Sequence, residues 1–330
     1  MALAIAAAFV SSAAYAAGDR ACDGPDVCCP PTLAEDLPEP QVVKIGVVLA
    51  GLYNVNEKAG TWDADYYLYE MWTPHPAFTP QTEIVNEVNR RDAQFDRTEL
   101  RNGSCIRSRR LYSTLHSGYN LRRYPFDRQT LILEFSDAEY SSQAVQYAPK
   151  PEAAGLTDET REMLSSWKIE SGLTYRRESR AFQWETNAPR YDYAIFKLGI
   201  RRHVTYHMIK FFLPLFVIVS LAFLVFWIDP EDLSSQVQVG VTCVLSAIAF
   251  QFVQTNTLPE VAYTTLTDRV YVICYLAIAL ALALAVHACA LARNRNKTHA
   301  VEIVRRCRWL FPSLTTLSLA VVVVWSFVRG

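Results

Sequence analysis

Four apolar runs in the second half of the chain restrict its fold more than any other feature. A helix needs about 20 apolar residues to cross a bilayer, and the runs at 211–228, 270–292 and 310–328 approach or exceed that length. The run at 239–253 is shorter and reaches a full crossing only with its polar flanking residues. The sequence therefore predicts four membrane-spanning helices, at roughly 207–228, 235–256, 268–292 and 309–328.

Basic residues between the last two runs indicate the orientation of the chain. Residues 293–308 contain repeated Arg and Lys but a single acidic residue, Glu302. Such segments lie on the cytoplasmic side, so four crossings place the N-terminal half outside. Residues 1–16 are typical of a secretory signal peptide, with a disordered Ala-rich start as the alternative. We expect a multi-pass protein of the plasma (inner) membrane, in contact with lipid, whose N-terminal domain is periplasmic or extracellular.

The exported half has the pattern of short β-strands. The segments "TLILEF" (130–135) and "YDYAIFKLGI" (191–200) alternate or run continuously in apolar character, as sandwich strands do. Clusters such as "RNGS" (101–104) are turn signals. The sequence predicts a β-sandwich extracellular domain followed by a four-helix transmembrane bundle. The expected divisions are a signal peptide at 1–16, an arm at 17–40, the sandwich at 41–203 and the transmembrane domain at 204–330.

Composition and side-chain spacing exclude several classes of function. The formal net charge of −1 argues against binding of nucleic acid through bulk positive charge. The histidines are scattered, no C-x-x-C pair occurs, and no nucleophile or carboxylate pair has a useful spacing. We therefore expect neither an enzyme nor a bound cofactor or metal. The exported cysteines can oxidise, but their spacing leaves the pairing open: Cys22, Cys28, Cys29 and Cys105.

The second apolar run carries a stripe of residues spaced by four, three, four and three positions. This spacing puts them on one face of a helix: Gln238, Thr242, Leu245, Ala249 and Phe252. One interpretation is a helix packed in a bundle, with polar side chains bonded to neighbouring helices. The other is a helix that lines a water-filled path, because the stripe grades from polar to apolar.

Four motifs, in order, resemble those of pentameric ligand-gated ion channels of the Cys-loop receptor superfamily, particularly the prokaryotic members. They are "YNLRRYPFDRQ" (119–129), "RRHVTYHMIKFFLP" (201–214), "TNTLPEVAYTTLTD" (255–268) and "RRCRWLFP" (305–312). The two cysteines that close a loop in animal receptors would fall at Ser117 and Leu131. The resemblance therefore implies that this chain lacks the disulfide of that loop. The resemblance implies a homopentamer with five subunits around a central pore.

The resemblance implies that the stripe of the second span lines the pore. Leu245 is the expected hydrophobic gate, with Ala249 and Phe252 as further constrictions, since an apolar ring blocks hydrated ions by dewetting. Gln238 and Thr242 would line the cytoplasmic end of the pore.

The loop before the pore helix carries the expected selectivity residues, Glu231 and Asp232. Rings of carboxylates favour cations, so we expect permeant monovalent cations. An anion-selective channel of the same fold is the alternative.

The resemblance also implies an agonist site between neighbouring extracellular domains. The candidate residues are Trp72, Tyr140, Trp184 and Tyr191, whose rings could attract an ammonium group. The alternative for each is packing in the domain core. Three arginines allow an anionic ligand instead: Arg107, Arg109 and Arg110. His203 and His207, one helical turn apart, could sense protons or only anchor the interface.

The expected coupling residues lie where the two domains meet. Asp127 and Arg202 are expected to form an ion pair, with Glu57 nearby, and Pro259 to direct the linker that follows the pore helix. Agonist or protons would then shift the population of closed and open states. A non-conducting membrane sensor is a second alternative.

Overall fold

The computed structural model describes residues 39–76, 78–162, 166–181, 189–255, 260–293 and 297–329. The signal peptide expected at 1–16 lies outside these residues, and so does nearly all of the arm expected at 17–40.

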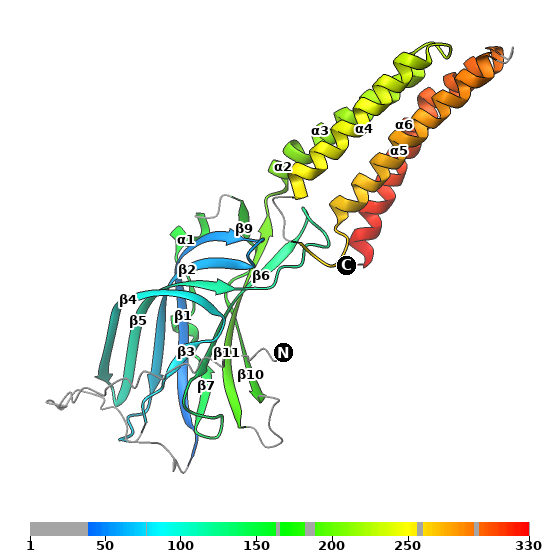
Figure 1. The fold of residues 1–330 in the computed structure, drawn as a ribbon. Helices are drawn as coiled ribbons and strands as arrows, with labels where there is room; N and C mark the ends of the chain where they lie inside the picture. The colour runs from blue at the N-terminus through cyan, green and yellow to red at the C-terminus, as the bar shows by residue number, and fades with distance from the viewer. Residues whose placement is uncertain are drawn as a thin grey trace, which may run out of the picture.

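Two sheets form a β-sandwich at the N-terminal end of the described chain (Figure 1). One sheet has the strand order β4-β5-β2-β1-β7, with β8 also paired to β1, and the other has the order β10-β11-β6-β3, with β9 paired to β11. The strands are β1 (Gln41–Asn56), β2 (Thr61–Trp72), β3 (Thr82–Ile84), β4 (Glu87–Arg101), β5 (Ser104–His116), β6 (Arg128–Asp137), β7 (Val145–Pro149), β8 (Gly155–Leu156), β9 (Trp167–Ile169), β10 (Thr174–Ala181) and β11 (Arg190–Arg202). A 3-10 turn (Pro151–Ala153) and the short helix α1 (Asp158–Glu162) lie between β7 and β9. The predicted sandwich is confirmed.

The strands form because apolar residues alternate with polar ones. Along β2 every second residue is buried, including Trp62, Tyr66 and Leu68. The ring of Tyr66 packs edge to face against Phe135 of the opposite sheet, with 6.4 Å between the ring centroids. Phe135 packs in the same way against Phe196, at 5.9 Å. Such aromatic contacts fill the space between the sheets and hold them together.

Four helices follow the sandwich and extend away from it (Figure 1). The first span runs from Val204 to Trp227 and consists of α2 (Val204–His207), a π-helical turn (Met208–Phe212), α3 (Leu213–Ala222) and a 3-10 turn (Phe223–Trp227). The others are α4 (Leu233–Thr255), α5 (Leu266–Arg293) and α6 (Lys297–Arg329). The π-helical turn stands just before Pro214, whose ring would clash with the carbonyl four residues earlier in a regular helix.

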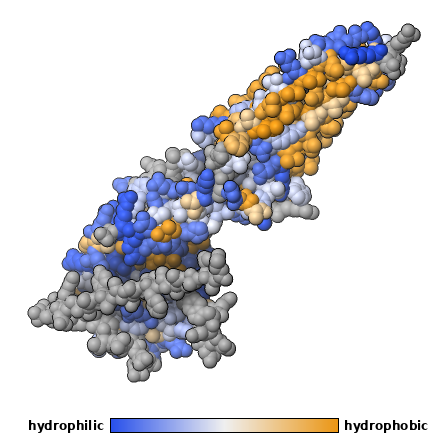
Figure 2. Space-filling view, viewed as in Figure 1, coloured by the Kyte–Doolittle hydropathy of each residue, from blue (hydrophilic) through white to orange (hydrophobic). Residues whose placement is uncertain are grey.

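All four helices are long and apolar enough to cross a membrane. Figure 2 shows apolar side chains gathered over the helices and hydrophilic ones over the sandwich. Only 11 % of the apolar stretch of α6 is buried within the chain, against 39 % for α5. The helix α6 packs on α5, so it lies at the edge of the bundle, where lipid can reach it.

The cysteines divide between the two domains as the sequence suggests. Those in the helices are free and buried, as packing residues are: Cys243, Cys274, Cys289 and Cys307. Cys105 is buried in β5 and is disulfide-bonded. Cys22, Cys28 and Cys29 lie outside the described residues.

Candidate pore helix and coupling junction

The helix α4 has a buried face and an exposed face. The buried face packs against α3 and α5 and consists of Gln236, Gly240, Cys243, Ala247 and Gln254. Every member of the predicted stripe is exposed: Gln238, Thr242, Leu245, Ala249 and Phe252. Because an α-helix turns by about 100° per residue, the stripe lies roughly opposite the buried face. Leu245 and Phe252 are 61 % and 69 % exposed, so only another molecule or water can cover them.

Two glutamines of α4 bond to neighbouring segments rather than joining the stripe. The Tyr275 hydroxyl on α5 donates to Gln251 Oε1 at 2.5 Å, and Gln236 Nε2 donates to the Asp229 carbonyl at 3.2 Å. On the stripe itself, the Thr242 hydroxyl donates to the Gln238 carbonyl at 2.7 Å. Some of the polar residues that interrupt this apolar helix therefore bond to neighbouring segments, and others lie on the exposed stripe.

Both expected selectivity residues lie in the loop before α4, and both have local partners. The Glu231 carboxylate forms an ion pair with the ammonium of Lys297, the first residue of α6. Asp232 accepts a hydrogen bond from the Ser235 backbone at 3.2 Å, as a helix N-cap does. Hydrogen bonds from Ser235 lower the pKa of the Asp232 carboxyl, so it stays ionised. One of the two acidic charges is thus partly neutralised.

Two of the aromatic residues expected to bind an agonist are buried in the sandwich. Trp72 is 2 % exposed and belongs to the sandwich core. Tyr140 is 6 % exposed and packs on Phe78 at 5.3 Å between ring centroids. For these two residues the structure favours the packing alternative, because a buried ring offers no face to a ligand. Tyr191 is half-buried in β11, and Trp184 lies outside the described residues.

The three arginines of β5 each have a carboxylate partner. The pairs are Arg107–Asp96 at 2.8 Å, Arg109–Glu70 at 2.9 Å and Arg110–Asp65 at 2.8 Å. An anionic ligand would have to displace these carboxylates, which weakens the alternative of an anion site on β5.

Arg202 lies at the centre of the junction between the sandwich and the helices. Its side chain is 3 % exposed. It pairs with Asp127 through two bonds, Nε to Oδ1 at 2.7 Å and Nη2 to Oδ2 at 3.0 Å, and its Nη1 donates to Glu57 at 2.7 Å. Its guanidinium also stacks over the rings of Trp167 at 4.2 Å and Tyr124 at 4.7 Å. The predicted ion pair is present, and its role in coupling stays a prediction.

The loop between β5 and β6 rests on the linker that joins α4 to α5. The Leu121 amide donates to the Tyr263 hydroxyl at 2.9 Å, and the Thr267 hydroxyl donates to the Tyr124 carbonyl at 3.1 Å. The Leu266 amide donates to the carbonyl of Arg122 at 3.0 Å. The described contacts lie at 263–267, and Pro259, which the sequence suggested, lies outside the described residues.

Comparisons with known proteins agree with this geometry. A family model of the neurotransmitter-gated ion-channel transmembrane region matches residues 211–310. A proton-gated ion channel of Gloeobacter violaceus is 24 % identical over 89 % of this chain and 85 % of its own length. These matches support a pentameric ligand-gated ion channel.

Two animal relatives match a smaller part of their own length. The pH-sensitive chloride channel 2 of Drosophila melanogaster is 26 % identical over 63 % of this chain, and the gamma-aminobutyric acid receptor subunit beta of Caenorhabditis elegans is 26 % identical over 72 %. The chain spans 40 % and 47 % of these two relatives. The four apolar helices and these channel relatives support a protein that crosses the membrane several times with its N-terminal domain outside. The relatives are ion channels and not enzymes.

The structure shows contacts of two residues, Lys297 and Tyr263, that the sequence did not predict. Lys297 is far from Glu231 in the chain, so no local pattern could pair them. Tyr263 lies inside the resembled linker motif, but nothing in the motif says which backbone group its hydroxyl would meet.

Proposed function

We propose that the chain forms a homopentameric ion channel in which five copies of α4 surround the ion path. The observation that carries the proposal is the exposed stripe of α4 opposite its buried face. Polar groups that face lipid are costly, so Gln238 and Thr242 fit a water-filled path better than a lipid surface. Copies arranged around an axis would turn Leu245 toward the centre.

In this pore, Leu245 forms the gate. A ring of leucines narrow enough to exclude water stops ions, because ions lose their hydration there without replacement. Ala249 and Phe252 form further rings toward the extracellular end. Thr242 and Gln238 offer hydroxyl and amide groups to a partly hydrated ion at the cytoplasmic end.

We propose that the channel passes monovalent cations with weak discrimination. Asp232 stays ionised at the start of α4, which favours cations. Lys297 lies against Glu231, which reduces the negative field at the same mouth. An anion-selective channel is the second candidate, and the Lys297 contact is the observation that favours it.

Protons are the stimulus that we propose to test first. One relative is named a proton-gated channel, and burial of Trp72 and Tyr140 removes two of the rings that an amine would need. The junction around Arg202 contains two carboxylates, those of Glu57 and Asp127, and the loop beside it contacts the linker behind α4. A small agonist between subunits remains the alternative stimulus.

The test is to record current through the purified protein in a planar bilayer, under a salt gradient, while pH and then small amines are stepped. Leu245→Ala runs alongside, with Ile248→Ala as the matched control, since Ile248 is exposed on α4 but outside the stripe. We expect a reversal potential on the cation side, and easier opening of Leu245→Ala alone. A reversal potential near the anion limit would keep the channel but overturn the selectivity. If Ile248→Ala opened more readily than Leu245→Ala, or if all three proteins stayed silent, the proposed pore would be wrong.

A further inference from the structure

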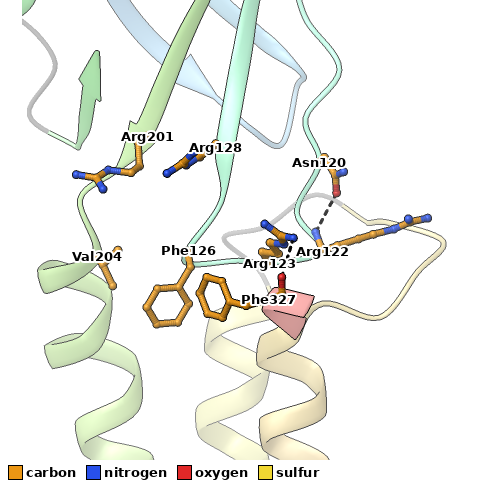
Figure 3. Close-up of a pocket in the computed structure, with 8 residues that line it drawn as sticks. All are labelled: Asn120, Arg122, Arg123, Phe126, Arg128, Arg201, Val204 and Phe327. Atoms are coloured by element: carbon orange, nitrogen blue, oxygen red, sulfur yellow. Dashed lines mark hydrogen bonds between the residues drawn. The ribbon is translucent and has the colours of Figure 1, made fainter. Parts of the chain in front are cut away.

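Side-chain contacts fix both ends of α6, the helix at the edge of the bundle. At its outer end, Phe327 packs edge to face against Phe126 with 5.6 Å between the ring centroids. Arg123 lies above Phe327 (Figure 3) and donates to its carbonyl at 3.4 Å. At its cytoplasmic end, Arg308 reaches the first span. The cytoplasmic contact is the one close to the loop that carries the expected selectivity residues.

Arg308 makes two contacts with the last turn of the first span. Its Nε donates to the Phe226 carbonyl at 2.9 Å, and its Cζ lies 4.6 Å from the centre of the Trp227 ring. The last carbonyls of a helix have no partner within the helix, and a cation at that end also interacts favourably with the helix dipole. Arg308 therefore caps the first span from a helix that is distant in the chain.

Apolar packing holds this cap in place. The 3-10 turn Phe223–Trp227 packs against α4, α5 and α6. Phe226 is 1 % exposed, and its ring centroid lies 5.2 Å from that of Phe311, three residues after Arg308. Because the Phe226 side chain is enclosed, its carbonyl has a fixed position at which the guanidinium can meet it.

The loop that follows the first span is compact, because its polar groups bond to one another. The Glu231 amide donates to Asp229 Oδ1 at 2.9 Å, and the Asp232 amide donates to the Asp229 carbonyl at 3.0 Å. Gln236 of α4 donates to the same carbonyl at 3.2 Å. The position of the whole loop therefore depends on where the first span ends.

We propose that Arg308 is a positioning residue for ion selectivity. It fixes the end of the first span, and thereby the carboxylates of Glu231 and Asp232 at the cytoplasmic mouth of the pore. The inference rests on the proposed channel, in which these carboxylates favour cations. Arg308 bonds to a backbone carbonyl and an indole ring rather than to an ion, so it acts through the loop. Selectivity then depends on a helix at the edge of the bundle.

Removal of Arg308 has two effects of opposite sign on selectivity. Loss of a positive charge near the mouth would by itself strengthen the preference for cations. Loss of the cap frees the end of the first span, so the carboxylates occupy more positions and select less sharply. The second effect should dominate in Arg308→Gln, because a charge on α6 acts on the ions over a longer distance and is screened by salt.

The test combines bilayer current under a salt gradient with hydrogen–deuterium exchange of the full-length protein in detergent. In Arg308→Gln we expect the reversal potential to move toward zero. The amides of residues 226–233 should exchange about tenfold faster, as expected for loss of one hydrogen bond from a charged donor.

Arg305→Gln is the matched control, since Arg305 is exposed on the same helix three residues earlier. This variant removes the same charge but not the cap. The exchange of residues 226–233 should therefore stay at the wild-type rate, and the reversal potential should stay at the wild-type value or move toward the cation limit.

The exchange measurement needs no current, so it separates this inference from the proposed function. Wild-type exchange rates at 226–233 in Arg308→Gln would overturn the positioning role whether or not the protein conducts. Faster exchange with a reversal potential at the wild-type value, or nearer to the cation limit, would overturn the role in selectivity. A silent or anion-selective wild-type protein would overturn the proposed selectivity and this use of it, while faster exchange in Arg308→Gln would still support the cap.

Trp227→Leu covers the case in which Arg308→Gln does not elute as an assembled protein on gel filtration. The Trp227 ring is 59 % exposed, so its replacement leaves no buried cavity. The variant keeps the bond to the Phe226 carbonyl and removes only the stacking contact. Both measurements should move in the same direction as in Arg308→Gln by smaller amounts, and no movement in either would overturn the proposal.

Discussion

The Arg202 guanidinium and the Asp127 carboxylate form a two-point ion pair, with Nε–Oδ1 at 2.7 Å and Nη2–Oδ2 at 3.0 Å. Both side chains are almost completely buried, at 3 % and 1 % exposed. Asp127 also accepts a bond from Gln129 Nε2 at 2.6 Å. A buried pair of this kind is retained only where its charges are fully bonded. It joins the last strand of the sandwich to the loop that rests on the linker behind α4.

We predict that Asp127→Asn both destabilises the channel and weakens its response. Removing one partner leaves the Arg202 charge buried beside an uncharged amide, which costs about 3–5 kcal/mol. The stimulus should then produce less current, because the loop between β5 and β6 is held less firmly. Thermal unfolding in detergent, followed by tryptophan fluorescence, measures the first effect, and the bilayer current measures the second.

The control for this variant is Arg97→Gln, which breaks an exposed pair with Glu99 at 3.5 Å. Exposed pairs contribute roughly 0–1 kcal/mol, so Arg97→Gln should unfold close to the wild-type temperature. Equal destabilisation by Asp127→Asn and Arg97→Gln would show that the junction pair contributes no more than a surface pair does.

Tyr263→Phe is predicted to weaken the transmission from the sandwich to α4. The variant removes the hydroxyl that accepts the Leu121 amide at 2.9 Å but keeps the ring under Arg122. Loss of one such bond costs about 1 kcal/mol, so the midpoint of the response should move about fivefold toward a stronger stimulus. Tyr206→Phe is the control, since its exposed hydroxyl bonds to Lys210, four residues along the same span. A shift of the midpoint in Tyr206→Phe but not in Tyr263→Phe would contradict a role for the linker contact.

Much of the architecture could be predicted because it depends on repeated local patterns. Apolar runs of membrane length and alternating strands each involve many residues, so one residue that departs from the pattern does not obscure it. The ion pair of Asp127 and Arg202 was expected only because the family resemblance placed both residues where the sandwich meets the transmembrane domain. The exposed stripe of α4 was expected from a spacing that repeats over several turns.

The remaining features depend on which residues meet in three dimensions. Trp72 and Tyr140 have the composition of a binding site, and sequence alone cannot tell a ring in the core from a ring in a cleft. Lys297 reaches Glu231 only because the last span begins close to where the first span ends. The pairing of Arg201 with Arg128 and Lys168 depends on the register between neighbouring strands, which the sequence of one strand does not contain.

Asp137 should make the stability of the sandwich depend on pH. Burial raises the pKa of its carboxyl, partly offset by hydrogen bonds from the backbone of Tyr140, Glu139 and Gln81. The folded protein therefore binds more protons than the unfolded chain between the ordinary carboxyl pKa and the raised one. In that window this group makes the free energy of unfolding fall as pH rises, by about 1.4 kcal/mol for each pKa unit.

Asp137→Asn removes that dependence, because the amide does not titrate. The unfolding temperature of the wild-type protein, minus that of the variant, should therefore increase as pH is lowered through the window just above the ordinary carboxyl value. Glu152→Gln, at an exposed position, should show a constant difference. A difference that stayed constant for Asp137→Asn as well would mean that Asp137 titrates alike in the folded and unfolded chain.

Lys297→Gln should increase the preference of the channel for cations. The variant removes the positive charge that lies against Glu231, so the carboxylate acts without a counter-charge at the cytoplasmic mouth of the pore. The reversal potential under a salt gradient should move toward the cation limit, and the shift should shrink at high ionic strength because salt screens exposed charges. Arg306→Gln is the control, since Arg306 is exposed on the same helix and pairs with Glu302 one turn away. An unchanged reversal potential in Lys297→Gln would place Glu231 too far from the ion path to select ions, and leave Asp232 as the only acidic candidate.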